Sequence, residues 1–340
     1  MARVSLIGAR VVTRRNVGVM IVAAACVAVI SGRAQEPVAV WIDTDPAIGV
    51  PDRDVDDGVA LMQAFGSPEL NIRGVSIVFG NAPFDRALPI GRDLAGKFGP
   101  SGLVVTAGAS SAEALGIETD ASRALAAELR RRPLTVLALG PATNVATVLK
   151  NHPDLASRMV RIVAVAGRRP GQKFTTGTTN VLGHRDFNFE LDPEAFRVLL
   201  SSGVPLVLAP FEISSKVWIE SADLDRLATG PPAARALVAP SRAWLALWRR
   251  RFTVDGFNPF DTLAIGLVAS PAGFVCEVLP IEIQTLPDDV TDPAMQGTAG
   301  GRKPYLLASA ASTSPTRASY CSGPPPGFKA DLMRRLMVAR

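Results

Sequence analysis

Short apolar segments alternate with amphipathic segments from residue 38 to residue 210, and this alternation constrains the fold more than any other feature of the sequence. The apolar segments have the length and composition of strands that are buried on both faces, and the amphipathic segments have helical spacing. We therefore expect an α/β fold with one open, mostly parallel, Rossmann-like sheet and helices on both faces. The predicted strands are 38–42, 72–79, 103–106, 134–139, 160–165 and 206–209, and the predicted helices are 59–65, 121–131 and 143–150.

The first 34 residues differ in composition from the rest of the chain. Arginines precede an apolar run at 17–30, which is shorter than the roughly 20 residues of a membrane span and is typical of a signal peptide. Thr13-Arg14-Arg15-Asn16-Val17 resembles a twin-arginine export signal. We expect cleavage before Gln35, export to the periplasm or the medium, and no stable membrane association afterwards. A lipoprotein cleavage site at Cys26 and an uncleaved single-helix anchor are the alternatives.

The net charge of +5 comes entirely from this leader, which contains five arginines and no acidic residue. Residues 35–340 are therefore neutral overall, and we expect no nucleic-acid partner. They contain no visible repeat or linker, so we expect a single domain, with long loops around one or two late strands at 286–327. Cys276 and Cys321 are too few for a disulfide framework or a zinc site, although an exported protein would permit them to pair.

Acidic residues gather directly after the first predicted strand. Asp43 and Asp45 lie at the end of that strand, and Asp57 lies where the next helix begins. Ligands of open parallel sheets bind at the carboxyl ends of the strands. Carboxylates that share such a place repel one another unless a cation neutralises them, and calcium accepts the irregular oxygen ligands that loops supply. The sequence therefore predicts a calcium site here, with Asp52 and Asp54 as solvated loop charges.

Four motifs follow one another at the ends of the predicted strands. They are Asp43-Thr44-Asp45-Pro46 with Asp56-Asp57-Gly58-Val59-Ala60-Leu61, then Val78-Phe79-Gly80-Asn81, Leu139-Gly140-Pro141-Ala142-Thr143-Asn144, and Phe187-Asn188-Phe189-Glu190-Leu191-Asp192-Pro193-Glu194-Ala195. Together they resemble the motifs of the nucleoside hydrolases, the inosine-uridine preferring family. The resemblance implies a calcium-dependent enzyme that hydrolyses the N-glycosidic bond of ribonucleosides.

The resemblance also implies roles for individual residues. The calcium ligands would be the side chains of Asp45, Asp57 and Asp261 and the backbone carbonyl of Leu139. Asp45 would also take the proton from the attacking water, and Asp43 would lie behind the ligands and support them. Ribose hydroxyls would be held by Asp56, Asn81 and Asn188, with Asp186 where the family usually has a glutamate.

The sequence departs from the family pattern in two places. Nine residues, Ala47 to Val55, separate the Asp-Pro pair from the Asp-Asp pair, where the family usually has two. We expect this segment to bulge outward and to return Asp56 and Asp57 to the site. Phe260 stands where the family usually has a histidine that protonates the leaving base, and a phenyl ring cannot donate a proton.

Other side chains are candidates for contacts with the base. His184 lies in the loop 175–186 and is a candidate substitute acid, with a solvated loop histidine as the alternative. His152 is expected to cap the end of the helix 143–150. Trp244 and Trp248 lie four residues apart on one helical face, so they either pack in the core or stack on the base.

Two other functions stay open at this point. Asp43-Thr44-Asp45 after a first strand also fits a haloacid-dehalogenase-like phosphatase with Asp43 as nucleophile and magnesium as metal, although Gly140-Pro141-Ala142 gives no acidic pair after the fourth strand. An exported nucleoside- or ribose-binding protein with weak or no hydrolysis would keep the calcium site and lack the acid. The expected partner is a small ribonucleoside, and a homo-oligomer is left open.

Overall fold

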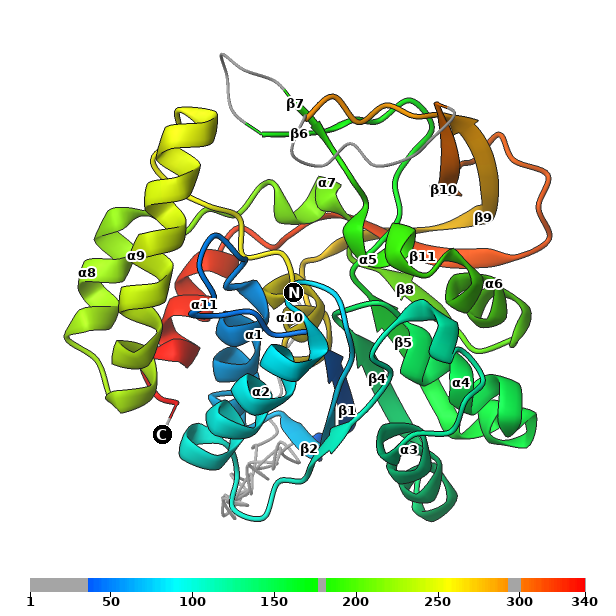
Figure 1. The fold of residues 1–340 in the computed structure, drawn as a ribbon, viewed down its shortest axis with the longest axis horizontal. Helices are drawn as coiled ribbons and strands as arrows, with labels where there is room; N and C mark the ends of the chain where they lie inside the picture. Colours follow the sequence, from blue (N-terminus) through cyan, green and yellow to red (C-terminus); the bar gives the residue numbers. More distant parts are fainter. Residues whose placement is uncertain (1–35, 177–181, 293–300, 340) are drawn as a thin grey trace, which may run out of the picture. The chain divides into compact units, whose positions relative to one another are not determined.

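Parallel pairing of the buried apolar segments builds the centre of the fold. The computed structural model describes residues 36–176, 182–292 and 301–339, so the predicted export signal lies outside the described residues. Within the described residues, nine strands form one sheet in the order β10–β9–β11–β8–β5–β4–β1–β2–β3 (Figure 1). Neighbours from β11 to β3 are parallel, and β9 and β10 extend one edge in antiparallel pairing. The structure therefore confirms the predicted fold class.

The bounds of the elements are as follows. The strands of the sheet are β1 Val38–Thr44, β2 Leu70–Ile77, β3 Val105–Ala107, β4 Leu134–Ala138, β5 Met159–Ala164, β8 Leu206–Leu208, β9 Val275–Pro287, β10 Arg302–Ala308 and β11 Arg317–Gly323, and β6 Phe174–Thr176 pairs with β7 Leu182–His184 in a separate hairpin. The helices are α1 Asp56–Phe65, α2 Phe84–Phe98, α3 Asp120–Arg131, α4 Thr143–Asn151, α5 Phe187–Leu191, α6 Pro193–Ser201, α7 Phe211–Ser214, α8 Ser221–Ala228, α9 Pro232–Phe252, α10 Thr262–Ala269 and α11 Phe328–Leu336, with 3₁₀ turns at Ala112–Ala114 and Pro153–Arg158.

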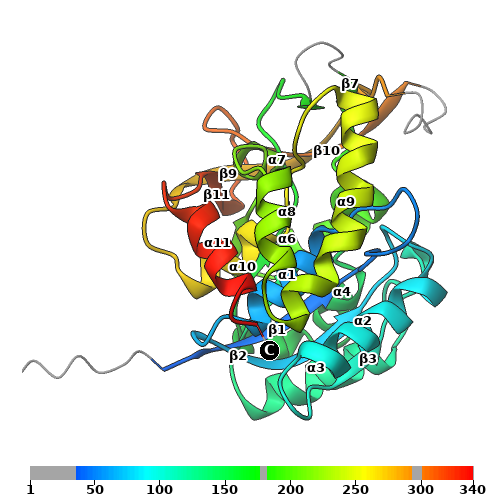
Figure 2. The same cartoon turned by 90° about the vertical axis from the view of Figure 1, so that its left-hand side faces the viewer.

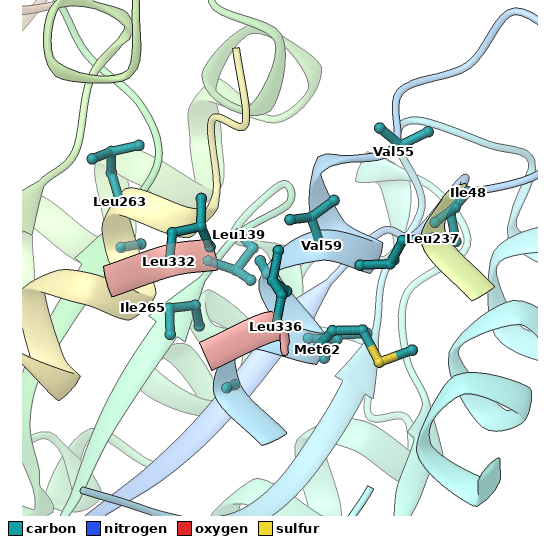
Figure 3. Packing of buried hydrophobic residues seen from close by; sticks show 14 of the residues in the cluster. Ile48, Val55, Val59, Met62, Leu139, Leu237, Leu263, Ile265, Leu332 and Leu336 are labelled. Carbon is teal, nitrogen blue, oxygen red and sulfur yellow. The ribbon is translucent and has the colours of Figure 1, made fainter. Parts of the chain in front are cut away.

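Helices cover both faces of the sheet, and each face has its own hydrophobic core. Helices α1, α2 and α8 to α11 pack on one face (Figures 1 and 2), whereas α3, α4 and α6 pack on the other. Figure 3 shows Val59 and Met62 of α1 facing Leu332 and Leu336 of α11 in the first core. Because interiors pack densely, truncating a buried leucine such as Leu332 to alanine costs about 2–5 kcal/mol. This packing holds α1 rigidly beneath the end of β1.

The predicted elements recur in the structure with shifts of one to three residues at their ends. The apolar segments were sufficient to predict the strands, because strands that are buried on both faces are apolar on both faces. The sequence did not reveal α2, and of α9 it indicated only the part that carries Trp244 and Trp248; these helices contain Pro89 and Pro240 within their helical turns. It also gave no sign of the long strand β9, Val275–Pro287, and placed loops directly after it, from residue 286.

The late part of the chain is tied to the sheet by a disulfide bond. Cys276 on β9 is bonded to Cys321 on β11, which settles the pairing that the sequence left open. The strands β10 and β11 account for the one or two late strands expected at 286–327. In the three described ranges, none of the helices has the length and apolar character needed to cross a bilayer.

Candidate active site

Asp45 follows β1 directly and lies in a cradle formed by two glycines. A Cβ atom at Gly80 would come within 1.9 Å of Asp45 Oδ2, and one at Gly140 would come within 2.7 Å of Oδ1. The backbone N–H of Asn81 donates to Oδ2 at 2.6 Å. Oδ1 is buried and accepts no hydrogen bond from any described residue. The glycines therefore bring the chain close to an oxygen that needs a further partner.

Asp57 lies at the beginning of α1, and its carboxylate is next to Asp45. Its Oδ1 accepts hydrogen bonds from the backbone N–H of Asp45 at 3.0 Å and from the hydroxyl of Thr44. Its Oδ2 accepts a hydrogen bond from Asn81 Nδ2 at 3.0 Å. The carboxylate therefore joins the ends of β1 and β2, and the segment 47–55 bulges out between Asp45 and Asp57 without separating them.

The segment 47–55 is anchored at its base and lines the cavity at its tip. Ile48 is buried against Gly58, where a Cβ atom would come within 2.7 Å of Ile48 Cδ1. Asp52 is exposed, as predicted, but Asp54 is half-buried. Asp54 Oδ1 accepts hydrogen bonds from the backbone N–H groups of Val55 and Asp56 and so stabilises the N-terminus of α1. Burial raises the pKa of Asp54 to about 7, which the solvated loop charge expected from the sequence would not show.

Asp261, at the N-cap of α10, completes a cluster of buried carboxylates. One oxygen from each of Asp56, Asp57 and Asp261 lies within 4.8 Å of the other two. Burial is the main cause that raises the pKa of Asp45 and of Asp261, and the neighbouring carboxylates raise both further. Within the described ranges, none of these four carboxylates has an ion pair with a cationic side chain. The cluster thus carries buried negative charge without a compensating group of the chain.

The donor set fits a hard divalent cation. All the donors are oxygens, and Asp45 Oδ1 and Asp261 Oδ2 are both buried without a hydrogen-bond partner among the described residues. Asp45, Asp57 and Asp261 are three of the calcium ligands that the resemblance implied, and Asp56 lies in the same cluster. Calcium takes six to eight such oxygens in irregular geometry.

The Leu139 carbonyl, the fourth implied ligand, follows β4 and faces α5. It accepts a hydrogen bond from Asn188 Nδ2 at 2.5 Å, and the same nitrogen donates to the Val165 carbonyl at 3.1 Å. A carbonyl oxygen has two lone pairs, so this contact leaves Leu139 able to bind a cation as well. The Asn188 amide oxygen is left for a ligand, because its nitrogen is committed to the two carbonyls.

Asp43 lies behind the cluster, inside the sheet. Its Oδ1 accepts hydrogen bonds from the Ser76 hydroxyl of β2 and from Asn144 Nδ2 of α4. Ser76 in turn accepts from the Trp41 indole at 2.8 Å, and Asn144 Oδ1 accepts from the backbone N–H of Ala109. Burial raises the pKa of Asp43 to about 7 against these hydrogen bonds. Asp43 therefore joins three elements beneath the site and does not line the cavity.

Asp186 and Asn81 both line the cavity. Asp186 Oδ2 accepts a hydrogen bond from the backbone N–H of Gly167 at 2.7 Å. Burial raises the pKa of Asp186 to about 6, while Arg168 acts in the opposite direction. Both residues line the cavity together with Asn188 and Asp56, so the structure brings the four predicted ribose contacts to one place.

A cavity of about 680 Å³ opens above the carboxylates. This volume lies within the range of small-molecule sites. Aromatic rings form one wall, with centroid separations of 4.7 Å between Phe174 and Phe211, 6.0 Å between Phe211 and Phe260, and 6.4 Å between Phe260 and Trp248. The cavity thus has an anionic floor and a flat apolar wall, which suits a polar sugar joined to a planar ring.

The tryptophans of α9 belong both to the core and to this wall. Trp248 is buried and packs edge-on against Phe252 at 5.2 Å, while Trp244 is half-buried and packs against Trp248 at 6.2 Å. Both line the cavity. Phe260, in place of the expected histidine, lies among these rings and brings no proton donor to the wall.

His184 lies at the end of β7 and lines the cavity, but its ring nitrogens are buried. Its Nδ1 lies 3.4 Å from Asp292 Oδ2, and Arg251 of α9 forms an ion pair with the same carboxylate. Burial is the main cause that lowers the pKa of His184, and Asp292 partly opposes it. His184 is thus not a solvated loop histidine. His152 caps the end of α4, as predicted.

Several residues that shape the site were not found from the sequence. Ser76 and Thr44 hold the carboxylates of Asp43 and Asp57, and Asp292 lies against His184 from a segment more than 100 residues away. Serine and threonine within strands give no distinctive pattern. Contacts between distant segments leave no trace in local spacing either.

Comparison with known proteins places these features in a wider context. Residues 40–302 match the family model of the inosine-uridine preferring nucleoside hydrolases. The pyrimidine-specific ribonucleoside hydrolase RihA of Salmonella schwarzengrund is 31% identical over 220 residues, which are 56% of this chain and 66% of that protein. RihA of Citrobacter koseri is 30% identical over 207 residues, or 52% of this chain and 64% of that protein. The alignment thus spans slightly less than two thirds of these curated relatives.

Solved structures show the same fold over a larger share of the chain. A plant nucleoside hydrolase, PpNRh1, superposes with a TM-score of 0.71 at 21% identity, covering 88% of this chain and 99% of that one. A purine-preferring ribonucleoside hydrolase from Gardnerella vaginalis superposes with a TM-score of 0.68 at 19% identity and the same coverage. At these identities the likeness establishes the fold alone.

Proposed function

The chain belongs to the family of inosine-uridine preferring nucleoside hydrolases, and on that premise we propose that it hydrolyses the N-glycosidic bond of ribonucleosides with the help of a calcium ion. The observation that carries the proposal is the buried cluster of Asp56, Asp57 and Asp261, to which Asp45 is joined by a hydrogen bond from its backbone N–H to Asp57. These carboxylates have no compensating cation among the described residues, and Asp56 and Asp261 line a cavity of nucleoside size.

The calcium ion would be held by Asp45, Asp57, Asp261 and the carbonyl of Leu139. When bound, it would supply the charge that neutralises the cluster, holds sugar hydroxyls and makes a nearby water more acidic. Calcium is favoured over magnesium because the ligands come from the loops after two strands, β1 and β4, and from the N-termini of two helices, α1 and α10, and calcium accepts the irregular oxygen sets that such segments supply.

Asp45 would act as the general base. Its Oδ1 faces the cradle between Gly80 and Gly140 without a described hydrogen-bond donor, so it is free to take a proton from a water molecule. In the metal-free chain, burial and the neighbouring Asp57 both raise the pKa of Asp45.

The chain would stabilise positive charge that develops on the sugar ring. Cleavage of an N-ribosidic bond proceeds through a sugar resembling an oxocarbenium ion. Asp56 and the other carboxylates on the floor are fixed in a buried place, where their field acts strongly on such a charge. Asn81, Asn188 and Asp186 would hold the ribose hydroxyls, so that analogues lacking a hydroxyl leave a buried polar group unpaired.

The aromatic wall would bind the base, and His184 is the candidate for its protonation. Trp248, Phe260 and Phe211 offer flat faces for stacking. His184 would have to turn a ring nitrogen toward the base, with Asp292 favouring its protonated form. Nucleosides that need strong protonation of the base should therefore react more slowly than ribosides with good leaving groups.

The alternative functions are less well supported. A phosphatase would need Asp43 as nucleophile, whereas Asp43 Oδ1 accepts hydrogen bonds from both Ser76 and Asn144. A binding protein without hydrolysis is favoured by one observation, the replacement of the proton donor by Phe260. A binding protein would bind a ribonucleoside without releasing its base, whereas a hydrolase would release the base and ribose.

The decisive experiment uses uridine, because the curated relatives are pyrimidine-specific. The purified chain from residue 35 onward is incubated with uridine and calcium, and free uracil and ribose are separated by chromatography. We expect both products in equal amounts and their loss in Asp45→Asn. Binding of uridine without release of uracil would show a binding protein instead.

Export is part of the same proposal. The disulfide between Cys276 and Cys321 supports it, because such bonds persist in oxidising compartments outside the cytoplasm. The arginine-led apolar run at 17–30 would provide the signal.

A further inference from the structure

Glu190 links the short helix α5 to the rest of the site. Its Oε1 accepts a hydrogen bond from the backbone N–H of Asp186 at 3.0 Å, and its Oε2 lies 3.3 Å from Arg185 Nη1. The same helix carries Asn188, whose amide holds the carbonyls that follow β4 and β5. The carboxylate of Glu190 therefore fixes the Asp186 end of the segment 186–188 directly, and it is linked to Asn188 through the helix that carries both.

Lys303 of β10 binds this carboxylate from outside the cavity. The ammonium group lies 2.5 Å from Glu190 Oε1 and 3.3 Å from Asp289 Oδ1, and the side chain is completely buried. The Tyr305 ring lies 4.8 Å from Nζ. Lys303 does not line the cavity, so it would not touch a ligand bound there.

Arg168 shares the same buried network. Its Nη1 lies 2.7 Å from Asp289 Oδ2, and its Nη2 lies 3.8 Å from Glu190 Oε1. Arg168 also packs over the ring of Phe174 in the aromatic wall at 4.0 Å. Glu190 is thus held by two buried cations, Lys303 of β10 and Arg168 from the segment after β5, and both cations also pair with Asp289. Removing either cation leaves this buried network with an excess of negative charge.

We propose that Lys303 is a positioning residue for ribose binding, which acts through Glu190 to hold Asp186 and Asn188 against the sugar. This inference rests on the proposed function, because it assumes that the segment 186–188 contacts ribose. Arginine or lysine at a protein surface would gain little from such a pair. Lys303 has no exposed surface, so its ion pair with Glu190 is rigid. The helix α5 has only five residues, and this ion pair fixes its position more firmly than so short a helix could by itself.

The test measures selectivity among sugars rather than total activity. The kcat/KM for uridine is divided by that for its 2′-, 3′- and 5′-deoxy analogues in the wild type and in Lys303→Met. A partly unfolded preparation lowers all four values equally and leaves the ratios unchanged. We expect at least one ratio to fall by about tenfold, because the hydroxyl contact is lost with the position of segment 186–188. We expect the KM for uridine to rise more than kcat falls.

Two further variants control for charge and for stability. Lys303→Arg keeps the charge and should restore most of the ratio that Lys303→Met loses. Arg335→Met removes another buried cation, which pairs with Glu69 and Asp331 on the far side of α1 and touches no site residue. It should lower thermal stability and leave all three ratios unchanged. If Lys303→Met is insoluble, Lys303→Gln removes the charge, keeps a donor, and should shift the ratio in the same direction.

The outcomes are distinguishable. Unchanged ratios in a folded Lys303→Met or Lys303→Gln that still cleaves uridine overturn the positioning role and leave the proposed function intact. A similar fall of the ratios in Arg335→Met also overturns it. A wild type that releases no uracil overturns the proposed function, and the positioning role with it.

Discussion

Replacing Asp261 by asparagine is expected to stabilise the metal-free protein and to remove most of its response to calcium. Asp261 is buried beside Asp56, Asp57 and Asp45, and its Oδ2 has no described hydrogen-bond partner. A buried charged group without a partner costs at least about 1–3 kcal/mol, which the neutral amide largely avoids. For a domain of this size, about 1 kcal/mol corresponds to roughly 2 °C in Tm. We therefore expect the metal-free variant to melt about 2–6 °C higher than the metal-free wild type.

Calcium should narrow this difference, because it stabilises the wild type more than the variant. A ligand at 100 times its Kd stabilises the folded state by about 2.7 kcal/mol, or roughly 5 °C here. The wild type should gain this shift, whereas Asp261→Asn, which lacks a ligand carboxylate, should gain less than half of it. Differential scanning calorimetry with calcium or with a chelator measures all four states.

A matched variant tests whether the expected rise in Tm depends on the lack of a cationic side chain beside the aspartate. Asp292 is also a buried aspartate, but it pairs with Arg251, so Asp292→Asn should lower the Tm of the metal-free protein and keep the calcium shift. A lower Tm for metal-free Asp261→Asn, or a full calcium shift in that variant, would refute the idea that the cluster is uncompensated without the ion.

The remaining predictions concern the leaving group, the pH dependence and export. His184→Ala should slow the cleavage of uridine at least about tenfold and leave p-nitrophenyl riboside nearly unaffected; equal losses would mean that His184 only supports its loop. The folded-state pKa values of Asp43 and Asp186, about 7 and about 6, lie above their unfolded value of 3.8, so the folded metal-free protein binds more protons than the unfolded one. Its Tm should therefore rise as the pH falls from 7 to 5, and a fall would contradict these pKa values. N-terminal sequencing of the protein from its native host should begin near Gln35, and soluble cytoplasmic protein that keeps Met1 would be incompatible with export.

The fold could be predicted from the sequence because the strands carry their own signal. Segments such as 134–139 are apolar except for Thr135, and only a parallel sheet covered on both faces buries them completely. The connection of β9 and β10 to the far edge could not be predicted in the same way. It depends on pairing between Cys276 and Cys321 and on contacts of Lys303, which join residues far apart in the sequence.

The floor of the site could be predicted and its surroundings could not. Asp45 follows β1 directly and Asp57 lies at the beginning of the helix that comes after this strand, so the two meet at one end of the sheet, and the bulge of 47–55 does not alter this. The buried position of His184 depends on Asp292 and on Phe252, which come from a loop and a helix with no local link to β7. Local spacing predicts which residues leave a strand end, but it does not predict what packs against them from elsewhere.

The central claim is that a calcium ion at the carboxylate cluster is required for cleavage of ribonucleosides. The most direct measurement titrates calcium into the metal-free chain and follows ion binding and ribose release from uridine in the same samples. We expect one ion per chain, and ribose release that rises in parallel with occupancy and disappears again with chelator. Ribose release that is undiminished in chelator, or an occupied site that releases no ribose, would contradict the claim.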